Sequence, residues 1–246
     1  MIEGWKMRVW WDKRLKWMRA STIAIATSLI LLLVFAAFTI YGNQVGSFVI
    51  NVDDHSNIRL SLSSHEDLSH QTERLAYDSV MELNDTTYEW LPNDISRQGI
   101  GNVSDMEGCR YLGYTFYLIN NSDRAVDYDM ELNLIDVVGD PLGMMRAMVI
   151  EEDKDTFDPS NRIFALPEST PERQQELEDD LATMKPYQTE DFPIGENKLF
   201  SINIKDFEVG GSRKYTVVIW LEGCDPDCVN ENSGARAKMQ LDITGY

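Results

Sequence analysis

Residues 125–137 read AVDYDMELNLIDV, and their strict alternation decides the fold class of this chain. Apolar positions alternate with acidic or amide positions: the first set is Val126, Tyr128, Met130, Leu132 and Leu134, and the second is Asp127, Asp129, Glu131 and Asn133. This period of two is typical of a β-strand with one face in a core and the other in water. The run RYLGYTFYLI at 110–119 precedes it, separated by turn residues at 120–123. We therefore expect an antiparallel hairpin.

Further strand-like runs lie on both sides of this pair. They cover residues 44–52, 58–63, 144–150, 162–166, 199–209, 213–222 and 235–246. Short strands separated by turn signals predict a mainly β fold, here an extracellular antiparallel β-sandwich of jelly-roll type. One short surface helix is expected from Ser169, a capping residue, to Pro186, which ends it.

A charge-free segment, ASTIAIATSLILLLVFAAFTIY, covers residues 20–41. A helix of this length is about 33 Å long, enough to cross the hydrocarbon core of a bilayer. The exit from Phe38 to Gly42 lacks the small-x-small pattern of a cleavage site. We expect a single N-terminal transmembrane helix that is not cleaved, and a long cleaved signal peptide is the alternative.

The charges around this segment predict its orientation. Residues 1–19 contain six Lys or Arg and only two acidic residues, and basic residues beside a hydrophobic span stay in the cytoplasm. The predicted organisation is a basic cytoplasmic tail at 1–19, a transmembrane signal-anchor at 20–41 and an extracellular domain at 42–246. The whole chain has 41 acidic and 22 basic residues, a net charge of −19. Such a surface repels nucleic acid, so a nucleic-acid partner is not expected.

The densest group of polar ligand atoms is EGCDPDC at residues 222–228, where a predicted strand ends. Carboxylates gathered in a loop suit Ca²⁺, with Glu222, Asp225 and Asp227 as the ligands, although EF-hand spacing is absent. The interpretation without a ligand is a rigid acidic turn, and it is favoured because Asp and Pro are ordinary turn residues. No other cofactor is expected.

Three cysteines, Cys109, Cys224 and Cys228, allow one disulfide and one remaining thiol in an exported chain. The local pair is Cys224 with Cys228, and Cys109 with either of them would connect distant parts of the chain. The sequence leaves all three pairings open. The spacing is not that of a Cys-x-x-Cys redox motif.

His65-Glu66-Asp67-Leu68-Ser69-His70 invites comparison with the HExxH motif of zinc proteases. Here the histidines are five residues apart, which on a helix places their rings about 140° apart, too far around to bind one ion from the same face. The neighbourhood is also polar and typical of a loop. No catalytic set is expected.

Three phrases, YGNQVGSF at 41–48, YTFYLIN at 114–120 and YTVVIWLEGCDPDC at 215–228, together resemble a group of exported proteins of Gram-positive bacteria. This group is distantly similar to the TasA and camelysin class, whose processing depends on signal peptidase W. The resemblance implies a secreted β-sandwich; TasA-like proteins build matrix fibres, and camelysin is described as a surface metalloprotease. The uncleaved segment and the Trp-rich basic tail depart from the secreted members.

These observations predict a non-catalytic, membrane-anchored protein of the cell surface with a structural, adhesion or matrix-associated role. Its expected partners are the membrane and surface or matrix proteins, or further copies of itself. The alternative function is a calcium- or ligand-binding sensor with its site at Glu222 to Cys228. A camelysin-like metalloprotease is the least favoured function.

Overall fold

The computed structural model describes most of the β-rich part of the chain and a short stretch before it. The described residues are 18, 22, 25–35, 48–53, 58–77, 83–98, 101–102, 111–167, 175, 178–179, 187–193, 197–230 and 234–246. The chain divides into two compact units, Met1–Val45 and Gly46–Tyr246.

In the first unit, residues 25–35 form an exposed helix of apolar side chains, and Met18 and Thr22 are also helical. The rest of the predicted segment at 20–41 lies outside the described residues. Within the described part, no helix reaches the length and apolar character needed to span a membrane.

The second unit is built from strands with two short 3-10 helices, η1 (Tyr88–Trp90) and η2 (Ile95–Arg97), among its described residues. The strands are β1 (Phe48–Asp53), β2 (Leu60–Ser63), β3 (Arg74–Tyr77), β4 (Asp85–Thr86), β5 (Gly101–Asn102), β6 (Leu112–Asn120), β7 (Val126–Val138), β8 (Met145–Glu151), β9 (Arg162–Ala165), β10 (Glu190–Asp191), β11 (Lys198–Phe207), β12 (Ser212–Glu222) and β13 (Arg236–Gly245). The nine predicted strands are confirmed within a few residues. The four short strands β3, β4, β5 and β10 are additional.

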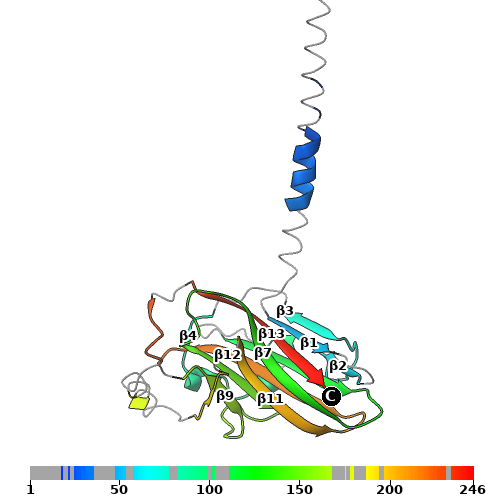
Figure 1. The fold of residues 1–246 in the computed structure, drawn as a ribbon. Helices are drawn as coiled ribbons and strands as arrows, with labels where there is room; N and C mark the ends of the chain where they lie inside the picture. The colour runs from blue at the N-terminus through cyan, green and yellow to red at the C-terminus, as the bar shows by residue number, and fades with distance from the viewer. Residues whose placement is uncertain are drawn as a thin grey trace, which may run out of the picture. The chain divides into compact units, whose positions relative to one another are not determined.

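These strands form two sheets packed face to face (Figure 1). Sheet A has the order β11-β7-β13-β1-β3, and sheet B has the order β10-β9-β8-β12-β6-β2, with β4 beside β12 and β5 beside β6. The predicted two-sheet sandwich is confirmed, but a purely antiparallel one is not. Three pairs are parallel: β1 with β13, β9 with β10, and β4 with β12. Parallel neighbours need long connections, and nearly the whole domain lies between β1 and β13.

The main core lies between the sheets and follows the alternation of the strands. On β7 the apolar side chains from Val126 to Leu134 are buried, as their spacing predicts. They meet the inward side chains of β12, such as Val217 and Ile219. One polar contact crosses this core, because the hydroxyls of Tyr128 on β7 and Tyr215 on β12 are 2.5 Å apart. That contact joins sheet A to sheet B.

A second apolar cluster covers the other face of sheet B. It contains Tyr88, Leu91, Ile95, Tyr111, Met148, Ile150, Ile163, Val218 and Trp220. Two segments, around residues 83–98 and 152–161, lie over this face and bond each other, for example from Thr156 N to Asn93 O at 2.8 Å. Because both faces of β8 and β12 are covered, residues 145–150 and 215–220 are buried without alternation.

The predicted hairpin of 110–119 with 125–137 is wrong. β6 belongs to sheet B and β7 to sheet A, so the turn between them is a crossing from one sheet to the other. The buried side chain of Asn120 stabilises this crossing: its Nδ2 donates to the carbonyl oxygens of Arg124, Phe207 and Glu208, and its Oδ1 accepts from Ser122 N. The side-chain amide of Asn120 thus satisfies backbone groups at this crossing, where no strand pairing between β6 and β7 is present to do so.

The predicted surface helix from Ser169 to Pro186 lies largely outside the described residues. Gln175, Glu178 and Asp179 are described, and they are helical and exposed, with Gln175 Nε2 donating to Asp179 Oδ1 at 2.9 Å.

Candidate functional site

Glu222 and Asp225, two of the predicted calcium ligands, are buried within sheet B and its cover. Glu222 is the last residue of β12 and is fully buried, and Asp225 is 4% exposed in the turn that follows. The bond from Asp225 N to Glu222 O at 3.1 Å closes this turn. These two carboxylates therefore face the protein interior, while Gly223 is exposed and Asp227 is half-buried.

Glu222 receives three hydrogen bonds on a single oxygen. Its Oε2 accepts from Trp220 Nε1 at 3.1 Å, from Tyr187 Oη at 2.9 Å and from Tyr88 N at 3.3 Å. Its other oxygen, Oε1, is buried without a hydrogen-bond partner among the described residues. The three aromatic donors also pack on one another, with the rings of Tyr88 and Tyr187 4.5 Å apart between centroids.

Asp225 forms a buried ion pair with Arg146 of β8. Arg146 Nη2 lies 2.5 Å from Asp225 Oδ2, and both side chains are at most 1% exposed. Arg146 Nη1 donates to the carbonyl oxygens of Gly143 and Met145 at 2.9 and 3.1 Å. The second carboxylate oxygen of Asp225 accepts from Asp227 N at 2.7 Å. We call Arg146, Tyr187, Glu222 and Asp225 the buried polar cluster.

The charges of this cluster shift the pKa values of its members. Burial lowers the pKa of Arg146, but Tyr187 and Asp225 outweigh burial and hold it above its ordinary value. The pKa of Tyr187 is raised, first by burial and then by the Glu222 carboxylate. Burial also raises the pKa of Tyr88 to about 12. The tyrosines are therefore hydrogen-bond donors at neutral pH.

The three candidate calcium ligands have different neighbours in the protein. Asp225 is engaged by Arg146 and Asp227 N, and Glu222 by aromatic donors, so these carboxylates are turned to different protein partners. The third carboxylate, Asp227, lies against Gly143, where an added Cβ would meet its Oδ2 at 2.3 Å. In the part of the chain that the structure describes, no three His, Cys, Asp or Glu side chains are placed to hold a metal ion. The geometry fits the alternative interpretation, a rigid acidic turn.

The cysteines of this turn are not joined to each other. The structure has no disulfide between Cys224 and Cys228, while Cys109 lies outside the described residues. Cys224 Sγ lies 3.6 Å from Thr87 Oγ1. Burial and the neighbouring carboxylates, Asp85 first among them, raise the pKa of Cys228, which disfavours the reactive thiolate.

The loop that carries His65 and His70 is not helical. Residues 64–70 form turns and bends after β2, in agreement with the predicted loop, and both histidines are exposed. The rings of His65 and His70 nevertheless lie 5.1 Å apart between centroids, tilted by 52°. A compact loop has thus brought together two imidazoles that a helix would separate.

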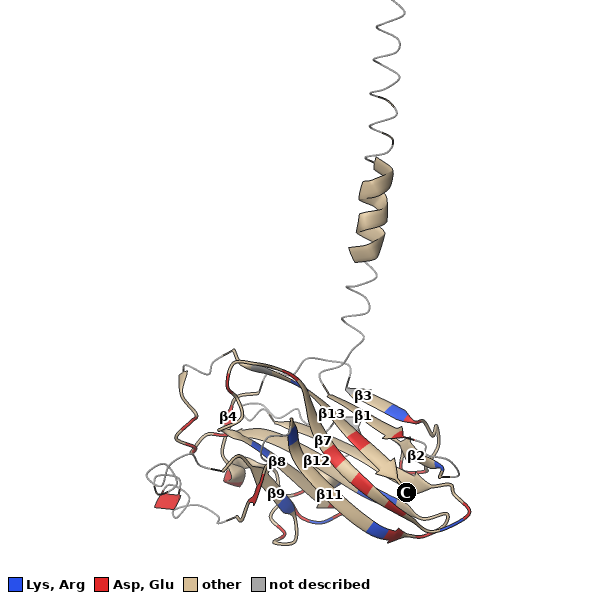
Figure 2. Cartoon of the chain, in the orientation of Figure 1, with Lys and Arg blue, Asp and Glu red and all other residues tan. Residues whose placement is uncertain are grey.

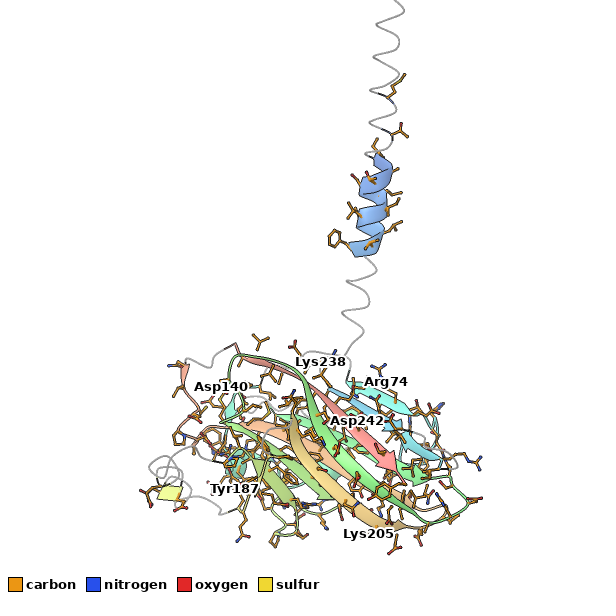
Figure 3. The ribbon with its side chains drawn as sticks, in the orientation of Figure 1. Arg74, Asp140, Tyr187, Lys205, Lys238 and Asp242 are labelled. Carbon is orange, nitrogen blue, oxygen red and sulfur yellow. The ribbon has the colours of Figure 1, made fainter. Side chains whose placement is uncertain are left out.

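The outer face of sheet A is a separate feature, a field of carboxylates and amides. The polar residues of β7 are half-buried and bonded across the strands: Asp129 accepts from Asn203 of β11 at 2.7 Å, and Glu131 pairs with Lys198 at 3.0 Å. On β13, Asp242 accepts from Asn133 and from Gln240, each at 2.8 Å. Figure 2 shows the acidic positions repeating along β7, and Figure 3 labels Asp242 on this face. We call it the polar face.

Arg146, Tyr187 and Trp220 were not singled out from the sequence, yet they position Glu222 and Asp225. Arg146 carried a usable signal, since it interrupts the apolar run MMRAMVI at 144–150. A lone charge in a strand that is buried on both faces requires a buried partner. Tyr187, labelled in Figure 3, lies beyond the predicted helix and gave no comparable signal.

Comparison with models of known protein families and with the sequences of curated proteins finds no match to this chain.

Proposed function

We propose that this chain is a membrane-held protein of the cell surface whose β-sandwich serves a structural or adhesion role through the polar face of sheet A. The occupant that we propose for this face is a basic patch on another surface or matrix protein. The sensor with calcium at Glu222 to Cys228 is not part of the proposal, because Glu222 and Asp225 are buried and are bonded to protein partners.

The observation that carries the proposal is the order of the polar face. Its carboxylates are held by cross-strand amide and ammonium donors, such as Asn203 on Asp129 and Asn133 on Asp242. Side chains fixed before binding lose little conformational entropy when a partner docks, so an acidic face whose side chains are held by hydrogen bonds favours association. Charge complementarity also selects basic partners and speeds their encounter.

Two further expectations support this role. The resemblance of residues 41–48, 114–120 and 215–228 to the TasA and camelysin class agrees with a surface β-sandwich, for which a jelly-roll is the expected topology. The charge-free segment at 20–41 and the basic tail before it are suited to an anchor with the domain outside the cell.

The adhesion role is tested by removing charge from the polar face. We expect the full chain, reconstituted in phosphatidylcholine liposomes, to bind polylysine-coated beads in a salt-dependent manner. The triple variant Asp129→Asn, Glu131→Gln and Asp242→Asn should bind several-fold less. The matched control removes the same three charges from exposed positions off the face, Asp123→Asn, Asp140→Asn and Glu151→Gln. An equal loss of bead binding in both triple variants would mean that only the net charge matters, and it would contradict the proposal.

The anchor is tested separately in intact cells that express the full chain. We expect the protein to stay with the membrane pellet after an alkaline carbonate wash, and external protease to remove the domain from Gly46 onward while leaving the tail. Recovery of the chain in the soluble fraction, or protection of the domain from protease, would contradict a surface anchor.

A further inference from the structure

We propose that His65 and His70 form a binding site for a divalent transition-metal ion of the Zn²⁺, Ni²⁺ and Cu²⁺ class. This site is separate from the polar face and from the buried polar cluster. Its chemistry also differs from that of the predicted calcium site, since imidazole nitrogens suit these metals and Ca²⁺ takes oxygen ligands.

The ring geometry is the first observation. The centroids of His65 and His70 are 5.1 Å apart. A tetrahedral metal about 2.0–2.1 Å from one nitrogen of each ring would hold the two centroids roughly 5 Å apart. The distance between the ring centroids therefore matches that of two ligands of one ion, and the remaining coordination positions would be filled by water.

The loop that carries the rings is fixed by its own hydrogen bonds. Ser63 is fully buried at the end of β2; its Oγ accepts from His65 N at 3.0 Å and lies 2.7 Å from Ser69 O, to which it donates. The β-bridge between Leu62 and Thr72 closes the loop below. Two ligands five residues apart are thus held close before any metal arrives, which reduces the entropy cost of binding.

The backbone of the loop is bent in an unusual way to achieve this. Leu68 and His70 have φ values of 57° and 54°, the left-handed region that non-glycine residues seldom adopt. Such conformations persist only where the surroundings enforce them. Without them, the chain could not fold His70 back toward His65.

The local charge also favours a cation. The carboxylate of Asp67 lies between the histidines in sequence, and its Oδ1 accepts a hydrogen bond from Ser69 N at 3.0 Å. An aspartate is an anion at neutral pH. Its charge would offset part of the charge of a bound divalent ion.

The experiment uses the untagged full chain in detergent, so that no affinity tag supplies histidines. Titration calorimetry with Zn²⁺ should give one saturable site of micromolar affinity, Cu²⁺ should bind more tightly, and Ca²⁺ should not compete. Addition of Cu²⁺ should broaden the ring NMR signals of two of the three histidines. We expect His65→Asn and His70→Asn each to weaken Zn²⁺ binding by more than about tenfold, since even second-shell changes cost this much.

The variants are chosen so that folding does not confuse the result. Asparagine tolerates the left-handed backbone at residue 70 but offers no imidazole. His55→Asn is the matched control, because it removes the third histidine of the chain and should leave the affinity unchanged. A wild-type chain without saturable binding would overturn the proposal and leave the ring contact as a plain aromatic one. Binding that survives both loop variants, or that His55→Asn abolishes equally, would overturn it as well.

Discussion

The Arg146→Met variant is expected to lower the free energy of unfolding by about 3–5 kcal/mol, because it leaves the Asp225 carboxylate buried without its cation. Both side chains are at most 1% exposed, so water cannot replace the lost partner. The carbonyl oxygens of Gly143 and Met145 lose a donor at the same time. Denaturation in urea, followed by tryptophan fluorescence, measures the change.

The matched control is Arg162→Met, which breaks an ion pair of the same length at the surface. Arg162 Nη2 lies 2.5 Å from Glu190 Oε2, but the two side chains are 39% and 47% exposed. We expect a loss of only about 0–1 kcal/mol there. The double variant Arg146→Met with Asp225→Leu should be more stable than Arg146→Met alone, because the unpaired charge is gone. If Arg146→Met and Arg162→Met lower the free energy of unfolding equally, the large effect expected of the buried ion pair is contradicted.

The strands were predictable wherever one face of the strand is buried and the other is exposed to solvent. On β7 and β13 the alternation of apolar and polar residues alone gave both the element and its buried face. On β8 and β12 the signal was a run rich in apolar residues, which correctly indicated strands. The second layer over sheet B was not predicted, and residues 88–95 supply part of it.

Pairing partners were less predictable, because they depend on contacts between distant residues. The turn at 120–123 is compatible with a hairpin, and only the bonds from Asn120 to Phe207 and Glu208 reveal a crossing between sheets. The same limit applies to the candidate sites. Glu222 and Asp225 were recognised as a dense acidic group, but their partners Arg146 and Tyr187 lie far away in the sequence. The rings of His65 and His70 were expected to lie far apart because a helix was assumed. The left-handed backbone at Leu68 was not predictable from the sequence.

The buried tyrosines make the domain sensitive to alkali, and the sign follows from the direction of their pKa shifts. Burial raises the pKa of Tyr88 to about 12 and raises those of Tyr128, Tyr187 and Tyr215 as well. In the unfolded chain each phenol ionises near pH 10, whereas in the folded domain it keeps its proton. Above pH 10 the unfolded state therefore binds fewer protons than the native state. The contribution of these phenols to the free energy of unfolding is fully present below pH 10 and is lost as the pH rises toward 12.

We expect the free energy of unfolding to drop by about 1.4 kcal/mol between pH 8 and pH 11 for each of Tyr88, Tyr128 and Tyr187, or roughly 4 kcal/mol for the three together. This is a large part of the stability of an ordinary domain. Urea denaturation at a series of pH values measures the drop, and the tyrosinate absorbance of the buried phenols should appear together with unfolding, after that of exposed phenols such as Tyr246. Ionisation of these phenols in a domain that stays folded would contradict the prediction.

The double variant Tyr128→Phe with Tyr215→Phe separates this effect from general charge repulsion in an acidic protein. It removes both hydroxyls of the contact between the sheets, so neither is left unpaired, and near pH 8 its cost should be small. Because two of the phenols whose pKa is raised are gone, the loss between pH 8 and pH 11 should be smaller than in the wild type. Tyr246→Phe, which removes an exposed phenol, should leave the loss unchanged. If both variants lose as much stability as the wild type, repulsion between surface charges causes the alkaline unfolding, and the phenols buried between the sheets do not.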